Sequence, residues 1–435
     1  MGNIHAGLSF GQFFAFFTRI GFTSFGGPAG QIALMHREIV DEKKWLSEDD
    51  FLHALNFCHL LPGPEAQQLA TYIGWKLKGI LGGIVAGLLF ILPGAIIVLG
   101  LTILYAFAAD LSWFQAMFMG IKAAVLAIVA QALIRISGRA LKSNFDKPLA
   151  ISAFVGLFFF NLPFPIIIIA AAIFGFLFAN NTNEVSPIEH QTKAPIREKT
   201  IQSLKAIVIW GSIWAIPFIL MYLTIGKENT FWEIGVFFSK LAVVTFGGAY
   251  AVLAYMAQEA VQTFGWLSAG EMANGLGLAE TTPGPLILVT QFVGYLAAFR
   301  APGPFTPLTA GLIGALITTW VTFAPCFLWI FAFAPWLDDL KKSIKLKASL
   351  AAITASIVGV IANLSFWFAL HVVFTRVGHL ENGIVKMIVP EWQSFDWKST
   401  QLVIICAILL FKTKIGTLRL LLVSAIVGLL LGLAI

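Results

Sequence analysis

Three basic residues of this sequence lie inside long apolar segments, where a charge is costly. They are Arg19, Lys122 and Lys240. Arg19 and Lys240 have equivalent surroundings, since each lies seven residues before a Gly-Gly pair, and Lys122 lies well inside segment 113–133. Charged groups in such segments usually face the protein interior or an aqueous path. Three cations with few nearby acids therefore indicate an anionic ligand. The alternative is that each side chain reaches out to an interface, which is hardest for Lys122.

Three titratable residues adjoin two Pro-Gly-Pro sequences. They are His59, Glu65 and Glu280, of which His59 and Glu280 are 221 positions apart at matching places. Carboxyl groups held in apolar surroundings can exchange protons near neutral pH. We therefore take these residues as candidates for proton coupling. The alternative is that they cap or hydrogen-bond the broken backbone beside them.

The Pro-Gly-Pro sequences themselves are candidates for ligand binding through the backbone. They are Pro62-Gly63-Pro64 and Thr282-Pro283-Gly284-Pro285. Two prolines around a glycine cannot continue a helix, because proline lacks a donor and restricts the residue before it. A helix that restarts after such a break directs free N–H groups and its positive dipole end at the break, which suits an anion. The alternative is a simple kink or a surface loop.

Two Phe-Gly-Gly sequences offer similar chemistry. The candidates around them are Thr23, Ser24, Gly26, Gly27, Thr245, Gly247 and Gly248. Glycine allows the backbone to approach a ligand closely, and the hydroxyl groups add donors. Close packing of helices through small residues is the alternative.

All of these residues belong to one long internal repeat. Gly26 corresponds to Gly247 at an offset of 221, and Pro93 corresponds to Pro325 at an offset of 232. The Pro/Gly-rich stretch 298–309 absorbs the change of offset as a loop insertion. A repeat of this length in an apolar chain is typical of a membrane transporter built from two related halves.

Composition sets the fold class. The 435 residues are 58% hydrophobic and 11% charged, with a formal charge of +6, whereas soluble domains are about 25% charged. The sequence predicts an all-α polytopic membrane protein of two inverted-topology repeats with broken or re-entrant helices, and about 10–13 transmembrane segments. The basic residues lie mostly in short loops, which indicates topology and contact with membrane lipids and argues against nucleic-acid binding.

Loop charges indicate that the two repeats are inverted. Segment 36–50 carries three Lys or Arg residues, while its counterpart 257–271 carries none. The pattern reverses one loop later, because segment 338–347 carries four lysines and segment 108–112 carries none. Since basic loops favour the cytoplasm, corresponding loops face opposite sides of the membrane. Arg135 and Arg139, at the end of a helical segment of the first half, are interpreted as part of this topology signal.

The expected domain organisation follows from the repeat. It consists of a first repeat at 1–180, a cytoplasmic linker at 181–203, an extra transmembrane helix at 204–225 and a second, inverted repeat at 226–435. The extra helix supplies the odd crossing that inversion requires if each repeat crosses an even number of times.

These elements resemble the chromate ion transporter family in its long, two-domain bacterial form. The resemblance covers nearly the whole chain and rests on the F-T-R-I-G-F-T-S-F-G-G-P stretch and its partners, at residues 17–28, 44–46, 60–68, 120–124, 240–250, 279–285 and 318–323. It implies export of chromate across the bacterial inner membrane, driven by the proton-motive force and giving chromate resistance. Sulfate, a tetrahedral dianion of similar size, is expected to compete or exchange.

We therefore expect a secondary transporter of chromate. The alternatives are a carrier or channel for sulfate or another oxyanion and, from a different class, a membrane-embedded enzyme. The sequence has no H-E-x-x-H, no P-loop and no paired Cys-x-x-Cys, so we expect no enzyme activity, cofactor or metal. The expected partners are chromate, sulfate, protons and membrane lipids, with a homodimer left open. The expected location is the bacterial inner membrane, with multiple passes.

Overall fold

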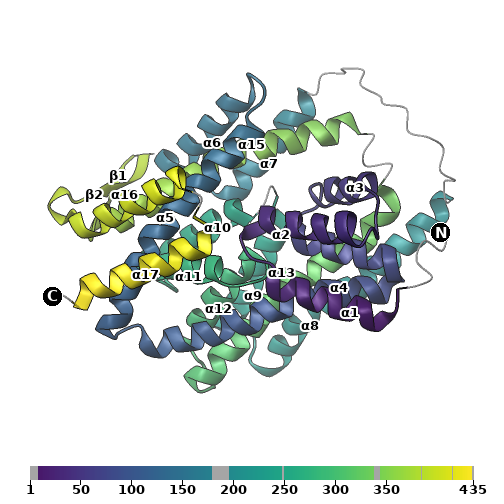
Figure 1. Ribbon diagram of the computed structural model, residues 1–435, viewed down its shortest axis with the longest axis horizontal. Helices are drawn as coiled ribbons and strands as arrows, with labels where there is room; N and C mark the ends of the chain where they lie inside the picture. The colour runs from purple at the N-terminus through teal and green to yellow at the C-terminus, as the bar shows by residue number, and fades with distance from the viewer. Residues whose placement is uncertain are drawn as a thin grey trace.

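The computed structural model describes residues 8–178, 195–246, 249–337, 343–383, 385–413 and 415–433. In this part of the chain nearly all regular structure is helical (Figure 1). The first half contains α1 (Phe10–Thr23), α2 (Gly27–His36), the π-helix η1 (Arg37–Glu42), α3 (Glu48–Cys58), α4 (Glu65–Ala108), α5 (Ser112–Ala140), α6 (Asp146–Phe160) and α7 (Phe164–Leu177). Helix α8 (Ile196–Thr224) follows and includes most of segment 204–225. It begins within the predicted linker 181–203, of which residues 181–194 lie outside the described part of the chain.

The second half repeats this order of elements. It contains α9 (Thr230–Val244), α10 (Ala249–Gln258), the π-helix η2 (Glu259–Thr263), α11 (Ala269–Thr281), η3 (Leu286–Leu288), α12 (Val289–Arg300), α13 (Pro307–Phe333), η4 (Ala334–Trp336), α15 (Ile344–Val373), α16 (Trp397–Lys412) and α17 (Thr417–Leu433). A π-helical turn is rare, so its presence after both α2 and α10 shows that the sequence repeat is also a repeat of structure.

Helix α4 is two helices joined at a break. Lys78 and Gly79 have non-helical backbone angles, and Gly79 has a φ of +67°, a conformation that favours glycine. The second half places a loop, residues 301–306, at the same position, between α12 and α13. The predicted loop insertion therefore lies where the first half has only a sharp break.

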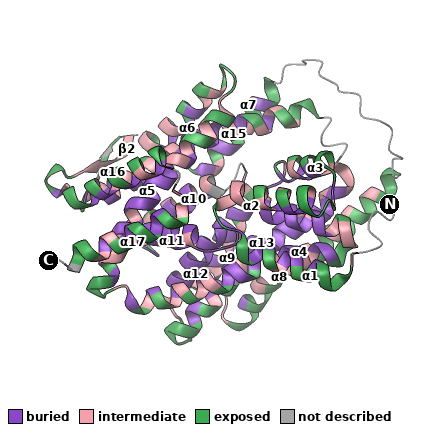
Figure 2. Cartoon of the chain, viewed as in Figure 1, coloured by how far each residue is buried: buried purple, intermediate pink, exposed green. Residues whose placement is uncertain are grey.

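Five of the described helices are long and apolar enough to cross a membrane, namely α4, α5, α8, α13 with η4, and α15. Shorter apolar helices accompany them, including α7 and α17. Buried residues run through the middle of the bundle, while much of the periphery is exposed (Figure 2). Large apolar side chains lie exposed there, such as Ile80, Ile96 and Leu223, as expected for a surface that faces lipid. The predicted class, an all-α polytopic membrane protein, is confirmed.

The long helices define two ends of the molecule. Helices α6 and α7 form a hairpin, so α7 returns to the end where α5 finishes. There Gly175 of α7 lies against Ala348 of α15. This end therefore gathers Arg139, near the end of α5, with Lys345 and Lys347, near the start of α15. We call it the basic end, and the other the opposite end.

The halves run through the bundle in opposite senses. Asp50, near the start of α3, pairs with Lys76 just before the break in α4. The matching helix α11 is instead tied to the far end of α4, because Asn274 Nδ2 donates to Tyr105 Oη at 2.8 Å. From the break beside Lys76 to Tyr105, α4 extends for about 40 Å, at 1.5 Å per residue. Corresponding helices therefore begin at different ends of the molecule, as the loop charges predicted.

One element was not predicted. Strands β1 (Val377–Asn382) and β2 (Val385–Pro390) form an antiparallel hairpin between α15 and α16, with Val377 opposite Pro390. Strand β2 packs against α6. The hairpin lies beyond the end of α15, at the opposite end of the molecule.

Candidate functional site

The two Pro-Gly-Pro sequences meet the other half of the molecule at its centre. Gly63 N–H donates to the carbonyl of Thr245 at 2.7 Å, and Gly284 N–H donates to the carbonyl of Ser24 at 2.9 Å. Each acceptor immediately precedes the Phe-Gly-Gly sequence of the opposite half. We call this pair of bonds the crossing. Both glycines have positive φ, +123° and +91°, which only glycine adopts without strain.

Side chains and helix kinks reinforce the crossing. Gln31 Nε2 donates to the carbonyl of Gly284 at 2.5 Å. Gly94, beside the proline of α4, lies against Pro283, while Cys326, beside the proline of α13, lies against Gly63. In each half, the long helix (α4 or α13) therefore packs, next to its internal proline, against the Pro-Gly-Pro sequence of the other half. The glycine N–H groups that could have faced an anion hold the two halves together in this conformation.

A large cavity of about 640 Å³ opens beside the crossing. Residues of α2, η1, α3 and α5 form its walls, and Glu65, Tyr250 and Glu280 form its floor. The polar and titratable residues that line it are His36, Arg37, Asp41, His59, Glu65, Gln131, Arg135, Arg139, Tyr250, Glu280 and Thr417. Because Arg139 and Thr417 lie at the basic end, the large cavity opens there.

The walls of the large cavity are strongly basic. Gln131, Arg135 and Arg139 follow one another at intervals of four, so they lie on one face of α5. Arg135 Nη2 donates to Gln131 Oε1 at 3.2 Å, which orients the guanidinium group. Arg37 adds a third arginine from η1 and is also ion-paired with Glu42 at 3.6 Å. The arginines of the walls outnumber their one lining carboxylate, Asp41, which favours an anion.

The floor of the large cavity is acidic. Glu280 is buried and accepts a hydrogen bond from Tyr250 Oη at 2.8 Å. It also interacts electrostatically with Arg135. Glu65, at the start of α4, has a similar relation to His59. Both carboxyl groups can therefore compete with a bound anion for the basic residues beside them.

Some predicted site residues line the large cavity and others do not. Those that line it are Gly26, Gly27, His59, Glu65 and Glu280. The Pro-Gly-Pro residues Pro62, Gly63, Pro64, Thr282, Pro283, Gly284 and Pro285 lie at the crossing. Gly247 and Gly248 lie outside the described residues.

The predicted hydroxyl donors face their own helices. Thr23 Oγ1 donates to the carbonyl of Arg19 at 2.8 Å, and Ser24 Oγ donates to that of Ile20 at 2.6 Å. Thr245 Oγ1 donates to the carbonyl of Leu241 at 2.5 Å. Each of these hydroxyl groups uses its one O–H donor in a hydrogen bond to the backbone. They are therefore not available to donate to a ligand in this conformation.

The three predicted cations are not brought together. Arg19 is ion-paired with the buried carboxylate of Glu38 and half-exposed. Lys240 is exposed. Lys122 lies beside Gly270 at the opposite end. None of the three lines the large cavity, and their role in binding stays a prediction.

The structure instead assigns the charge of the large cavity to Arg37, Arg135 and Arg139. Sequence reasoning treated these residues as signals of topology. The sequence contained an indication of this polar wall, because residues 131, 135 and 139 share one helix face. Gln131, a carboxamide in the middle of an apolar segment, also indicates a polar path.

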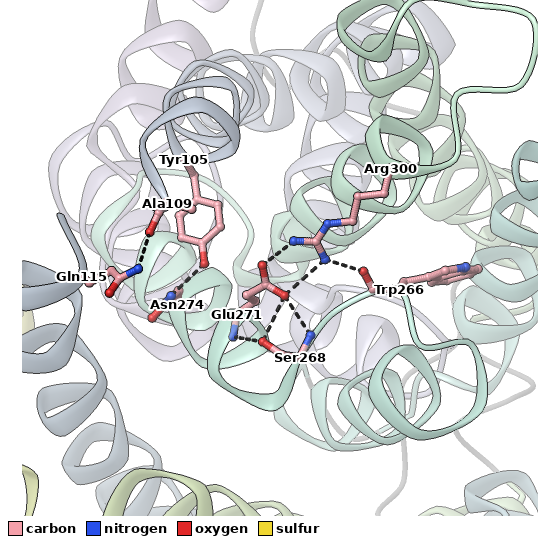
Figure 3. Close-up of polar contacts among 8 residues, drawn as sticks. All are labelled: Tyr105, Ala109, Gln115, Trp266, Ser268, Glu271, Asn274 and Arg300. Atoms are coloured by element: carbon pink, nitrogen blue, oxygen red, sulfur yellow. Dashed lines mark hydrogen bonds and ion pairs between the residues drawn. The ribbon is translucent and has the colours of Figure 1, made fainter. Parts of the chain in front are cut away.

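A second polar cluster closes the opposite end (Figure 3). Arg300 forms an ion pair with Glu271 and donates to the carbonyl of Trp266 at 2.7 Å, while Ser268 caps α11 through Glu271. Burial acts to raise the pKa of Glu271, but the hydrogen bonds from Arg300 and from the Ser268 backbone outweigh it and lower that pKa. Lys122 lies within electrostatic reach of Glu271. This end is therefore held by charge pairs.

The first half has an equivalent serine cap and ion pair at the basic end. Ser47 caps α3, and Asp50 pairs with Lys76 at 2.5 Å. Partial burial acts to raise the pKa of Asp50, and the hydrogen bonds from Lys76 and Ser47 reverse this and lower it. Within the described ranges, no group of three His, Cys, Asp or Glu side chains is placed to hold a metal ion.

Comparison with known proteins agrees with this architecture. The chromate transporter family matches residues 11–176 and 232–429. A chromate transport protein of Pseudomonas aeruginosa is 31% identical over 360 residues, covering 81% of this chain and 80% of the relative. A probable chromate transport protein of Synechococcus elongatus is 26% identical over 360 residues, covering 83% and 84%. No solved structure matches the chain. Since the family match extends over most of both halves, the chain belongs to the chromate transporter family.

Proposed function

We propose that this protein is a secondary exporter of chromate, which binds the oxyanion in the large cavity and carries it out of the cytoplasm. The observation that carries the proposal is the set of three arginines around a cavity of about 640 Å³. The names of the relatives support chromate as the cargo. The lysines and arginines of the basic end support a cytoplasmic position for that end, since basic residues favour the cytoplasmic side of a membrane.

The arginines suit a tetrahedral dianion. A guanidinium group presents several donors in a fixed fork and binds oxyanions through two oxygens at once. Arg135 and Arg139 approach from α5 and Arg37 from η1, so a dianion between them would replace its water shell from two sides. The low polarity of the surrounding helices strengthens these contacts relative to water.

Proton coupling would use the floor of the large cavity. Glu280 and Arg135 interact electrostatically, so an anion bound at Arg135 competes with the carboxylate of Glu280. When Glu280 takes up a proton, it no longer competes for the arginine. Glu65 and His59 form a second candidate pair. Proton and anion occupancy are then linked through a shared cation.

Movement would follow from the inverted halves. In transporters of this type one half rocks against the other around a central site. The crossing is suited to be the pivot, since its two hydrogen bonds are equivalent and join the halves at their centre. The exported anion would leave at the opposite end, on the outer side of a bacterial inner membrane, and export would confer chromate resistance.

The test is flux of labelled chromate in proteoliposomes of the purified protein with an imposed pH gradient. We expect transport that depends on the gradient and is lost in the Arg135→Gln variant. The matched control is Arg197→Gln, because Arg197 is exposed at the start of α8 and does not line the large cavity. Equal flux with and without protein, or full activity of Arg135→Gln, would refute the proposal.

Sulfate is the second candidate cargo, because the same three arginines would bind any tetrahedral dianion of this size. Sulfate that stimulates chromate flux from the other side of the membrane indicates exchange. Sulfate flux that exceeds chromate flux under the same gradient would make sulfate the main cargo. An enzyme that reduces chromate is distinguished by the recovered product, which a transporter leaves as hexavalent chromium.

A further inference from the structure

A small cavity lies between the second half of the molecule and α6 of the first half. Its volume is about 110 Å³, and it lies among α6, α10, α15 and β2. Its polar lining consists of Asn161, Gln258, Gln262, Asn363 and Lys386. Gln258 Nε2 and Asn161 Oδ1 are hydrogen-bonded across it. It takes no part in the site described above.

The small cavity is the repeat counterpart of the large one. Six residues that line the large cavity have their repeat mates in the lining of the small cavity, at offsets of 221 in α2 and η1 and 232 in α5. The pairs are Ala33 and Ala254, Arg37 and Gln258, Asp41 and Gln262, Gln131 and Asn363, Ala132 and Leu364, and Arg135 and Trp367. The same surfaces of both halves therefore form a cavity, but of very different size.

The two cavities lie towards different ends of the molecule. Helix α6 starts next to the end of α5, at the basic end, and Asn161 at its far end lines the small cavity. Helix α10 connects the two sites, since Tyr250 in its first turn lines the floor of the large cavity and Gln258 at its end lines the small one. These positions are about 12 Å apart along the helix axis. The small cavity therefore lies on the far side of the floor.

The small cavity has lost the arginines. Gln258 replaces Arg37 and Trp367 replaces Arg135, while Arg139 corresponds to His371. Carboxamides can donate hydrogen bonds to an oxyanion but carry no charge. Lys386 of β2 is the one Lys or Arg among the described residues that line the small cavity. Leu364 also fills space that its mate Ala132 leaves open in the first half. An anion would meet one cation here instead of three arginines, so it would be held less tightly and released.

The β1–β2 hairpin covers the small cavity. Leu380 and residues 386–388 of the hairpin contribute to its lining. The first half has no such cover, because residues 141–145 alone connect α5 to α6, whereas residues 374–396 connect α15 to α16. In Figure 1 the hairpin lies at the side of the bundle, next to α16 and close to α6. It is an addition specific to one face of the membrane.

We propose that the small cavity is the exit chamber for the transported oxyanion, seen in its closed form, with the β1–β2 hairpin as its cover. In the alternate conformation the large cavity closes at the basic end and the small cavity opens at the opposite end. This inference rests on the proposed transport function. Three arginines line the large cavity, whereas the small one offers carboxamides and a single lysine, Lys386. This difference favours binding on the arginine side and release on the carboxamide side.

Thiol labelling from each side of the membrane tests the proposal. The native cysteines Cys58, Cys326 and Cys406 are buried, so single cysteines can be introduced as Asn363→Cys and, at the repeat mate, Gln131→Cys. A membrane-impermeant maleimide is added to intact cells or to everted vesicles. We expect Asn363→Cys to react in intact cells, faster when chromate is being transported, and Gln131→Cys to react in everted vesicles.

The outcomes separate this inference from the proposed function. Failure of both Asn363→Cys and a second variant, Gln262→Cys, to react from outside, in protein that still transports chromate, would overturn the exit chamber. Reaction of these cysteines only in everted vesicles would overturn it as well. Outside labelling in protein that carries no chromate supports the chamber and removes chromate as its cargo.

Discussion

The two halves of the molecule share their backbone but differ in their charges. Gly63 and Gly284 make equivalent hydrogen bonds at the crossing, and each half caps its α3 or α11 helix with a serine and an ion-paired acid. In contrast, the position of His59 is occupied by Glu280, and that of Arg135 by Trp367. Equivalent backbones allow two conformations of similar energy. The side chains that break the equivalence are then free to set which ion binds and from which side.

The largest effect is expected from removal of the charge that distinguishes the halves. Arg135→Gln should lower chromate transport at subsaturating substrate by about tenfold to a hundredfold. A hydrogen bond to a charged group contributes about 1.5–3 kcal/mol, and 1.4 kcal/mol corresponds to a factor of ten. The measurement is initial flux in proteoliposomes.

The opposite substitution sharpens the same comparison. Trp367→Arg would place an arginine in the small cavity, and we expect slower release, seen as a lower maximal rate with a smaller apparent KM. An unchanged maximal rate would show that charge in the second half does not control release.

The next effect concerns the shared backbone. Gly63→Ala and Gly284→Ala should each lower the free energy of unfolding by about 1–2 kcal/mol or more, because both residues have positive φ and an added Cβ is strained there. The contacts are also tight, since a Cβ on Gly63 would lie 2.7 Å from Gln68 Nε2. Thermal unfolding in detergent measures this loss.

The control for these glycines is Gly100, which lies inside helix α4. A Cβ on Gly100 would meet no atom within 4 Å, so Gly100→Ala should keep or slightly raise stability, as alanine favours helix over glycine by about 1 kcal/mol. If only one of the two crossing glycines tolerates alanine, the halves are not equivalent at the crossing.

A smaller effect is expected at the two capping ion pairs. Glu271→Gln should destabilise by about 1–2 kcal/mol, since Glu271 contacts both Arg300 and the cap of α11. Asp50→Asn should cost about 1 kcal/mol or less, because Asp50 is more exposed than Glu271 and exposed pairs contribute little. Equal losses would show that exposure does not separate them.

The smallest effect is the dependence of these pairs on pH. The pKa of Glu271 is lower than its ordinary 4.5, and that of Asp50 is lower than 3.8. A lowered pKa contributes stability above the ordinary value that is lost as pH falls through the lowered value. Melting temperature should therefore decline from about pH 5 to pH 3, and less steeply in the Glu271→Gln variant. A slope identical to wild type would exclude Glu271 as the source.

Much of the fold could be predicted because it depends on short-range patterns. Apolar runs gave the helical membrane class, the offset of 221 gave the repeat, and loop charges gave its inversion. The hairpin was missed although Asn382-Gly383 is a recognised turn signal between strands. In a chain dominated by apolar helices, two short strands after α15 carry too little periodicity to stand out.

The site was harder to predict because it depends on long-range partners. Arg19 looked like an unpaired charge, yet Glu38 neutralises it from the next helix. The Gly63 N–H looked free, yet its acceptor Thr245 is far away in the sequence. Arg135 looked like a topology marker because it lies near a helix end. In each case the deciding fact is a neighbour that only the folded chain provides.

Helix α8 links the centre of the molecule to the bilayer. Only 11% of its most apolar stretch is buried, so lipid surrounds most of it. Its Trp210 stacks on Phe327 of α13 with ring centroids 4.8 Å apart, and the neighbouring Cys326 touches Gly63 at the crossing. A change in membrane thickness that tilts α8 would displace Trp210, and this movement would be transmitted through Phe327 and Cys326 to the crossing. The rate of turnover should therefore vary with the acyl-chain length of the surrounding lipid.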